Sequence, residues 1–128
     1  MKSIACSIGA IVLGTLLIGG CDTAATPEET AEVYKKHLCA GQAEKARALL
    51  EPELVKFYGD AAALEWLQEE AKTCQNNGGL KSFSIESKEN INESRVLFKY
   101  TAEYGKGMKE SSEIAMRPID GKWFVSAH

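Results

Sequence analysis

The hydrophobic positions of this 128-residue chain change their spacing once along its length. From residue 26 to residue 76 the hydrophobic residues recur every three or four positions, a spacing that places their side chains on one face of an α-helix. Thr26, Pro27 and Glu29 form a start signal with a capping box, and Gly41 ends this first helix. The three predicted helices and their inward positions are residues 27–40 (Ala31, Tyr34, Leu38), residues 43–50 (Ala43, Ala46, Leu49, Leu50) and residues 61–75 (Leu64, Leu67, Ala71, Cys74). Residues 54–58 are apolar but too short to assign.

After Gly79 the hydrophobic period becomes two, which is typical of a β-strand with one buried face. A first strand is predicted around Phe83 and Ile85, and a long second strand at residues 95–104. The Asp120-Gly121 pair predicts a tight hairpin between a third strand, near residues 114–116, and a last strand at residues 122–125. This order predicts an α+β fold in which three N-terminal helices pack on a curved antiparallel sheet of about four strands.

Residues 3–21 carry no charge and follow Lys2. Their length is roughly enough to cross a bilayer core of about 30 Å, but four glycines weaken such a helix. The positive end, the apolar middle and the final Ile18-Gly19-Gly20-Cys21 resemble the lipobox of bacterial lipoproteins. In that family the cysteine thiol receives a diacylglycerol and the chain is cut before it. The resemblance implies lipid attachment at Cys21 and cleavage between Gly20 and Cys21; an uncleaved signal anchor is the alternative.

The lipobox resemblance also implies how the chain is organised and where it works. It predicts a signal peptide at residues 1–20, a lipidated tether at 21–26 and one domain at 27–128, on a cell membrane and facing the periplasm or the exterior. Asp22 resembles the signal that keeps lipoproteins in the inner membrane of some enteric bacteria. The net charge is −3, and loss of Lys2 with the signal makes it one unit more negative. Nucleic acid is therefore not an expected partner, whereas the membrane is, through the lipid.

Two cysteines remain once Cys6 leaves with the signal and Cys21 carries lipid. In an exported protein Cys39 and Cys74 are expected to form a disulfide between the ends of the first and third helices. The loop that it closes would contribute roughly 3.5–4 kcal/mol to stability. A redox or metal pair is the alternative, but the chain has no CxxC motif and no His/Cys cluster, so no metal site is expected.

Three short motifs resemble a known superfamily in their order and spacing. They are Thr26-Pro27-Glu28-Glu29, the Ala40-Gly41-Gln42-Ala43-Glu44-Lys45-Ala46 corner with the following Leu49-Leu50, and the closing Asp120-Gly121-Lys122-Trp123. Together they resemble the cystatin-like cone of the nuclear transport factor 2-like (NTF2-like) superfamily, and more narrowly its small bacterial lipoproteins of unknown function. The resemblance implies a hollow between helices and sheet, and a sheet face that can bind a partner protein.

The candidate chemistry in that hollow is sparse. Enzymes of the superfamily place an acid or a histidine inside the cone as general base, but no carboxylate falls among the apolar positions of residues 96–104. We therefore expect no catalysis and no cofactor, and a binding or protein-interaction module for an envelope protein or a small apolar ligand. The alternative is a small-molecule enzyme with His37 as base. Aromatic side chains are more often core than pocket, but the candidate pocket residues are Tyr34, His37, Tyr58, Trp66, Phe98 and Tyr100.

Overall fold

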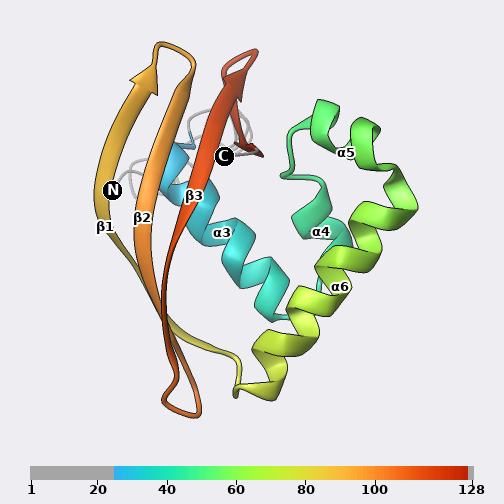
Figure 1. Ribbon diagram of the computed structural model, residues 1–128, viewed down its shortest axis with the longest axis vertical. Helices are drawn as coiled ribbons and strands as arrows, with labels where there is room; N and C mark the ends of the chain where they lie inside the picture. The colour runs from blue at the N-terminus through green and yellow to red at the C-terminus, as the bar shows by residue number, and fades with distance from the viewer. Residues whose placement is uncertain (1–24, 127–128) are drawn as a thin grey trace, which may run out of the picture.

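The computed structural model describes residues 25–126, and its helices precede its strands as predicted (Figure 1). The fold is α+β. Within the described residues the helices are α3 (Pro27–Cys39), α4 (Ala43–Arg47), α5 (Pro52–Tyr58) and α6 (Asp60–Asn76), and the strands are β1 (Leu80–Asn92), β2 (Arg95–Tyr104), β3 (Lys109–Ile119) and β4 (Lys122–Ser126). No helix in this part of the chain is long and apolar enough to cross a membrane.

The predicted signal peptide and lipid site are not part of this description. Residues 1–20, Gly20 and Cys21 at the cleavage point, and Asp22 all lie outside the described residues. The boundaries predicted at residues 20 and 26 therefore stay predictions. The described part begins just before α3, at Ala25.

The four strands form one antiparallel sheet in the order β1-β2-β3-β4, and the sheet curves around α3 (Figure 1). Phe98 of β2 pairs with Ile114 of β3 and Tyr100 with Ser112, and these positions face the helices. Within residues 25–126 strand β1 pairs with β2 alone, and its register shifts at three points along its length. At the opposite edge, Leu50 forms an isolated parallel bridge with Val125 of β4.

Helix α3 lies against the concave face of the sheet and supplies much of the core. Its capping box is present: the Glu29 N–H donates to the Thr26 hydroxyl, and the Thr26 N–H donates to the Glu29 carboxylate, each at 3.0 Å. The cap satisfies backbone N–H groups that have no partner inside the helix. The main core cluster consists of Ala31, Tyr34, Leu38, Ala43, Ala46, Leu50, Ala63, Leu67, Val96, Phe98, Met116 and Val125.

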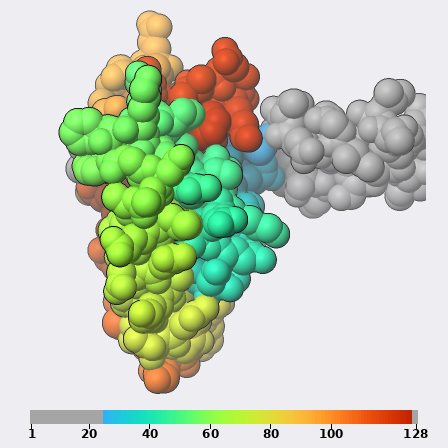
Figure 2. All heavy atoms as spheres, turned by 90° about the vertical axis from the view of Figure 1, so that its right-hand side faces the viewer, coloured from blue at the N-terminus to red at the C-terminus, as the bar shows by residue number. Residues whose placement is uncertain are grey.

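Helices α4 and α6 cover the side of α3 that faces away from the sheet, and they dominate the face seen in Figure 2. Cys39 at the end of α3 and Cys74 near the end of α6 form a disulfide, with their Cα atoms 5.4 Å apart. The predicted bridge is therefore present in the structure. Tyr100, Ala102 and Tyr104 of β2 pack around it in a second buried cluster.

The structure adds one helix to the three predicted, because residues 52–58 form α5. No residue of α5 is buried. The helix is held by the residue that precedes it: the Glu51 N–H donates to the Val125 carbonyl at 2.7 Å, and the buried Glu51 carboxylate accepts from Arg117 at 2.5 Å. Strands β3 and β4 thus hold the start of α5, and Leu54 and Tyr58 farther along the helix line a cavity.

The two ends of the molecule differ in the elements that meet there and in whether a disulfide links them. One end, at the bottom of Figure 1, holds the β2–β3 turn and the last turn of α6; the Cys39–Cys74 bridge lies there, and we call it the closed end. The other end, at the top, holds α5 and the tips of the β1–β2 and β3–β4 hairpins, and we call it the open end. Ala25 lies near the open end, because it borders a surface hollow with Gly121 and Trp123 of the β3–β4 hairpin.

Candidate functional site

A cleft of about 520 Å³ lies between α5, α6 and the end of β4. This volume falls in the range of small-molecule sites, roughly 300–1,000 Å³. Two aromatic rings stay accessible at its rim, since Tyr58 is 61% exposed and Trp66 is 52% exposed. We call it the outer cleft; its lining residues are Leu50, Leu54, Tyr58, Ala62, Ala63, Trp66, Val125 and Ser126.

The turn at Gly59 places α5 and α6 on either side of this cleft. Gly59 has φ 93°, a backbone conformation that residues with a Cβ rarely adopt. Its N–H donates to the Val55 carbonyl at 2.7 Å and ends α5, while its carbonyl accepts from the Ala63 N–H at 2.9 Å and starts α6. The chain therefore reverses within one residue, and Tyr58 and Trp66 come to line the same cleft.

A second, smaller pocket of about 260 Å³ continues from the outer cleft into the cone. Trp66, Val125 and Ser126 line both spaces, so the two adjoin. Here the lining becomes more polar, because α3, α6 and β3 bring ionised side chains to it. We call it the inner pocket; its lining residues are Tyr34, Lys35, Leu38, Trp66, Glu70, Phe83, Tyr100, Glu110, Ser112, Glu113, Ile114, Ala115, Val125 and Ser126.

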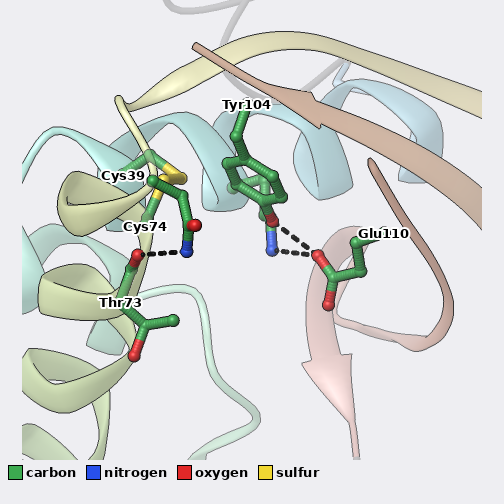
Figure 3. A network of polar contacts seen from close by, with 7 residues as sticks. Cys39, Thr73, Cys74, Tyr104 and Glu110 are labelled. Atoms are coloured by element: carbon green, nitrogen blue, oxygen red, sulfur yellow. Dashed lines mark hydrogen bonds and ion pairs between the residues drawn. A yellow bond between two sulfur atoms is a disulfide. The ribbon is translucent and has the colours of Figure 1, made fainter. Parts of the chain in front are cut away.

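A partly buried ion pair stands at the closed end of the inner pocket. The Lys35 ammonium lies 3.2 Å from the Glu110 carboxylate oxygen that also accepts a hydrogen bond from the Tyr104 hydroxyl at 2.5 Å (Figure 3). The same ammonium lies 5.6 Å from the ring centroids of both Tyr100 and Tyr104, within reach of a cation–π interaction. Helix α3 and strand β3 are thus joined by one charged network behind the pocket.

The environment keeps both members of this pair ionised. Burial alone would lower the pKa of Lys35, but the hydrogen bond with Tyr104 and the charge of Glu110 outweigh it and raise that pKa above its ordinary value. Burial likewise would raise the pKa of Glu110, yet the hydrogen bond from Tyr104 and the Lys35 charge bring that pKa below its ordinary value. Burial raises the pKa of Tyr34, so this phenol stays protonated.

The predicted pocket residues are distributed over different parts of the structure. Tyr34, Trp66 and Tyr100 line the inner pocket, and Tyr58 joins Trp66 at the outer cleft. Phe98 is fully buried in the core.

His37 lies on α3 away from both spaces, and its Nδ1 is 3.1 Å from the Gln42 side-chain oxygen on the exposed side of the helix. Among residues 25–126, no three His, Cys, Asp or Glu side chains are grouped so as to hold a metal ion.

The charged residues that line the inner pocket were not predicted from the sequence. Lys35, Glu70 and Glu110 have no local motif, and each is a charged residue that the pattern alone assigns to solvent. Glu110 lies 75 residues from Lys35 along the chain, so only the fold brings them together. One signal was present for Lys35: it sits next to Tyr34 on a helix whose buried face is wide.

The element order and the curved antiparallel sheet over α3 are those of an α+β cone, and the likeness to solved structures below shows that this fold is NTF2-like. No protein-family model and no curated protein matches the chain. Among solved structures, one named an NTF2-like transpeptidase from Campylobacter jejuni is similar at 23% identity and TM-score 0.67, over 81% of this chain and all of that chain. A SEC-C motif containing protein from Rhodopseudomonas palustris is similar at 14% identity and TM-score 0.60, over 86% of this chain and 82% of that one. At these identities the likeness concerns the fold.

Proposed function

We propose that the protein is a lipid-anchored cell-envelope lipoprotein whose NTF2-like domain is a non-enzymatic binding module for a small, largely apolar ligand. The observation that carries the binding role is the outer cleft, which is lined mainly by apolar side chains and keeps Trp66 and Tyr58 accessible at its rim. Accessible aromatic rings beside an apolar concavity are the usual means of holding an apolar body.

The geometry favours a binding role over the enzymatic alternative. A general base must reach the proton it removes, at about 2.6–3.2 Å or through one water. His37 borders neither the outer cleft nor the inner pocket, and its ring is engaged with Gln42. Glu110, one of three carboxylates that line the inner pocket, is held by Lys35 and Tyr104 in its ionised form. Neither arrangement supports proton transfer to a bound molecule.

The anchoring part of the proposal rests on the lipobox-like residues 18–21 and on where the described domain begins. Helix α3 starts at Pro27, so the tether after Cys21 is short. A few extended residues at about 3.5 Å each hold the domain close to a lipid surface. Two or more acyl chains on Cys21 would make that attachment stable.

The anchor is tested by the intact mass of the protein extracted from membranes. The expected mass lacks residues 1–20 and carries the added acyl chains on Cys21. A Cys21→Ser variant is expected to leave the membrane fraction. An extracted chain that retains residues 1–20 and has an unmodified Cys21 would exclude the lipoprotein proposal.

The binding role is tested with Trp66 as an internal reporter. Trp66 and Trp123 are the two tryptophans of the sequence, so a Trp123→Phe background leaves only the one at the cleft. The full chain in phosphatidylcholine nanodiscs is titrated with the neutral probe 3-phenylpropanol, and a saturable change in Trp66 emission is expected.

A matched pair of variants locates the probe. Ala62 lines the outer cleft, whereas its exposed neighbour Ala61 does not. Ala62→Phe is expected to fill the cleft and weaken binding about tenfold, which corresponds to about 1.4 kcal/mol. Ala61→Phe is expected to bind as the background does. Equal binding by both variants, or no saturable binding at all, would refute the cleft as a ligand site.

A further inference from the structure

The charges that line the site are unequal in sign. Lys35 is the single cationic side chain among the described residues that line the outer cleft and the inner pocket. Three carboxylates line the inner pocket with it, from Glu70 of α6 and from Glu110 and Glu113 of β3, whereas the outer cleft has no charged lining residue. The formal charge of the lining is therefore negative, and it is confined to the inner pocket.

The one cation is already engaged. The Lys35 ammonium is paired with Glu110 at 3.2 Å and lies between the Tyr100 and Tyr104 rings. An anionic ligand that approached Lys35 would also approach the Glu110 carboxylate and would have to give up its hydration beside a like charge. The site therefore disfavours a carboxylate or a phosphate on its ligand.

Glu70 differs from Glu110 in its partners. None of the ion pairs formed within residues 25–126 includes Glu70. It lies four residues after Trp66 on α6, so the two side chains are neighbours on one helix face, and both line the inner pocket. An accessible indole ring beside an ion-pair-free carboxylate is an arrangement that attracts an organic cation.

We infer that the ligand is an organic amine: its apolar body fills the outer cleft, and its protonated nitrogen lies against the Trp66 ring and the Glu70 carboxylate. This inference rests on the proposed binding function and adds to it the charge of the ligand. It also assigns Glu70 as the residue that selects the ligand, although the bulk of the contact is apolar.

The test compares three probes that share one aromatic body and differ in end group: 3-phenylpropylamine, 3-phenylpropanol and 3-phenylpropionate. Each is titrated calorimetrically into the full chain in phosphatidylcholine nanodiscs, with empty nanodiscs as the blank. The amine is expected to bind about tenfold more tightly than the alcohol, and the carboxylate more weakly than either.

A neighbouring pair of variants separates the site from the general acidity of the helix. Glu70→Gln is expected to remove most of the preference for the amine and to leave the alcohol unchanged. Glu69→Gln removes the same charge one residue away, at a position that lines neither space, and is expected to keep the preference. Loss of the amine preference in both variants would assign it to the overall charge of α6 and overturn the role of Glu70.

The remaining outcomes also decide between the ideas. If the alcohol and the amine bind equally, the binding module stands and the inferred cation is wrong. If the carboxylate binds best, the inference is overturned. If none of the three probes binds, the inference fails together with the small-ligand proposal. Binding of a basic apolar peptide in their place would show that the cleft is a protein-docking site.

Discussion

The closed end and the open end of the molecule use the same helix, α6, in different ways. Near its C-terminus α6 buries Ala71 and Cys74 and is joined covalently to α3. Near its N-terminus it leaves Trp66 half exposed beside α5, a helix without one buried residue. The same helix therefore closes the molecule at one end through a covalent link and borders an open cleft at the other.

The largest effect is expected from removing the covalent link at the closed end. The Cys39→Ala/Cys74→Ala double variant frees a loop with a sequence separation of 35 and should lose about 3–4 kcal/mol of unfolding free energy. Urea unfolding followed by circular dichroism measures the loss, and the reduced wild-type protein serves as the control. A loss below about 1 kcal/mol would show that packing alone closes this end.

At the open end the largest expected effect comes from Arg117, which compensates the buried Glu51 carboxylate in front of α5. Arg117→Met leaves that carboxylate buried without its cation and should cost about 2 kcal/mol. The matched control is Glu53→Gln, since Glu53 is exposed and lies 3.8 Å from the same guanidinium. If both variants unfold at the same urea concentration as the wild type, the attachment of α5 does not depend on this pair.

A smaller effect, and one that depends on pH, is expected at the ion pair behind the inner pocket. The pKa of Glu110 is lower in the folded chain than its ordinary value of 4.5, so its stabilising effect is complete above that value and is lost as the pH falls through the folded pKa. Because Glu110 is partly exposed, Glu110→Gln should cost only about 1 kcal/mol at neutral pH.

The difference between wild type and Glu110→Gln should then shrink as the pH is lowered from about 5 to about 3. Unfolding curves at several pH values measure it, with Glu89→Gln, an exposed carboxylate on β1, as the control. A difference that stays constant across this range would mean that the charge of Glu110 is not what stabilises the network.

The smallest effect is expected on the exposed surface of α5. Phe57 is 80% exposed and contacts Tyr58 edge to face, with ring centroids 4.9 Å apart. Phe57→Ser should change the unfolding free energy by less than about 0.5 kcal/mol, as surface substitutions usually do. A larger loss in thermal or urea unfolding would show that α5 contributes to stability rather than only to the shape of the cleft.

The hydrophobic pattern predicted those helices and strands that bury one face against a partner element. In α3 and β2, burial against a partner element makes apolar residues recur at the spacing of the element, so both appear in the structure close to their predicted limits. Helix α5 escaped prediction because its apolar run is short and none of its residues is buried, so no buried stripe shows the helical period. The second half of β1 escaped prediction because both of its faces are exposed and mostly polar; backbone pairing with β2 holds it.

In the candidate site, too, apolar residues were predicted and charged residues were not. The accessible aromatic residues Tyr58 and Trp66 were predicted, because aromatic side chains are candidates for lining an apolar pocket whatever their position in the sequence. Lys35 and Glu110 were not predicted, because residues that pair between a helix and a distant strand form no characteristic spacing in the sequence. His37 was picked for its chemistry, but the helix turns it toward Gln42.

The register shifts in β1 have a consequence for how copies of the molecule behave beside one another. An outer strand of this length offers a row of unused amide and carbonyl groups to any neighbour. In β1 the offsets interrupt that row at three points, and charged side chains along it would lose hydration if another strand paired there. At the far edge the short β4 is guarded by the chain at Leu50. Both edges of the sheet are therefore unfavourable places for a further strand to pair.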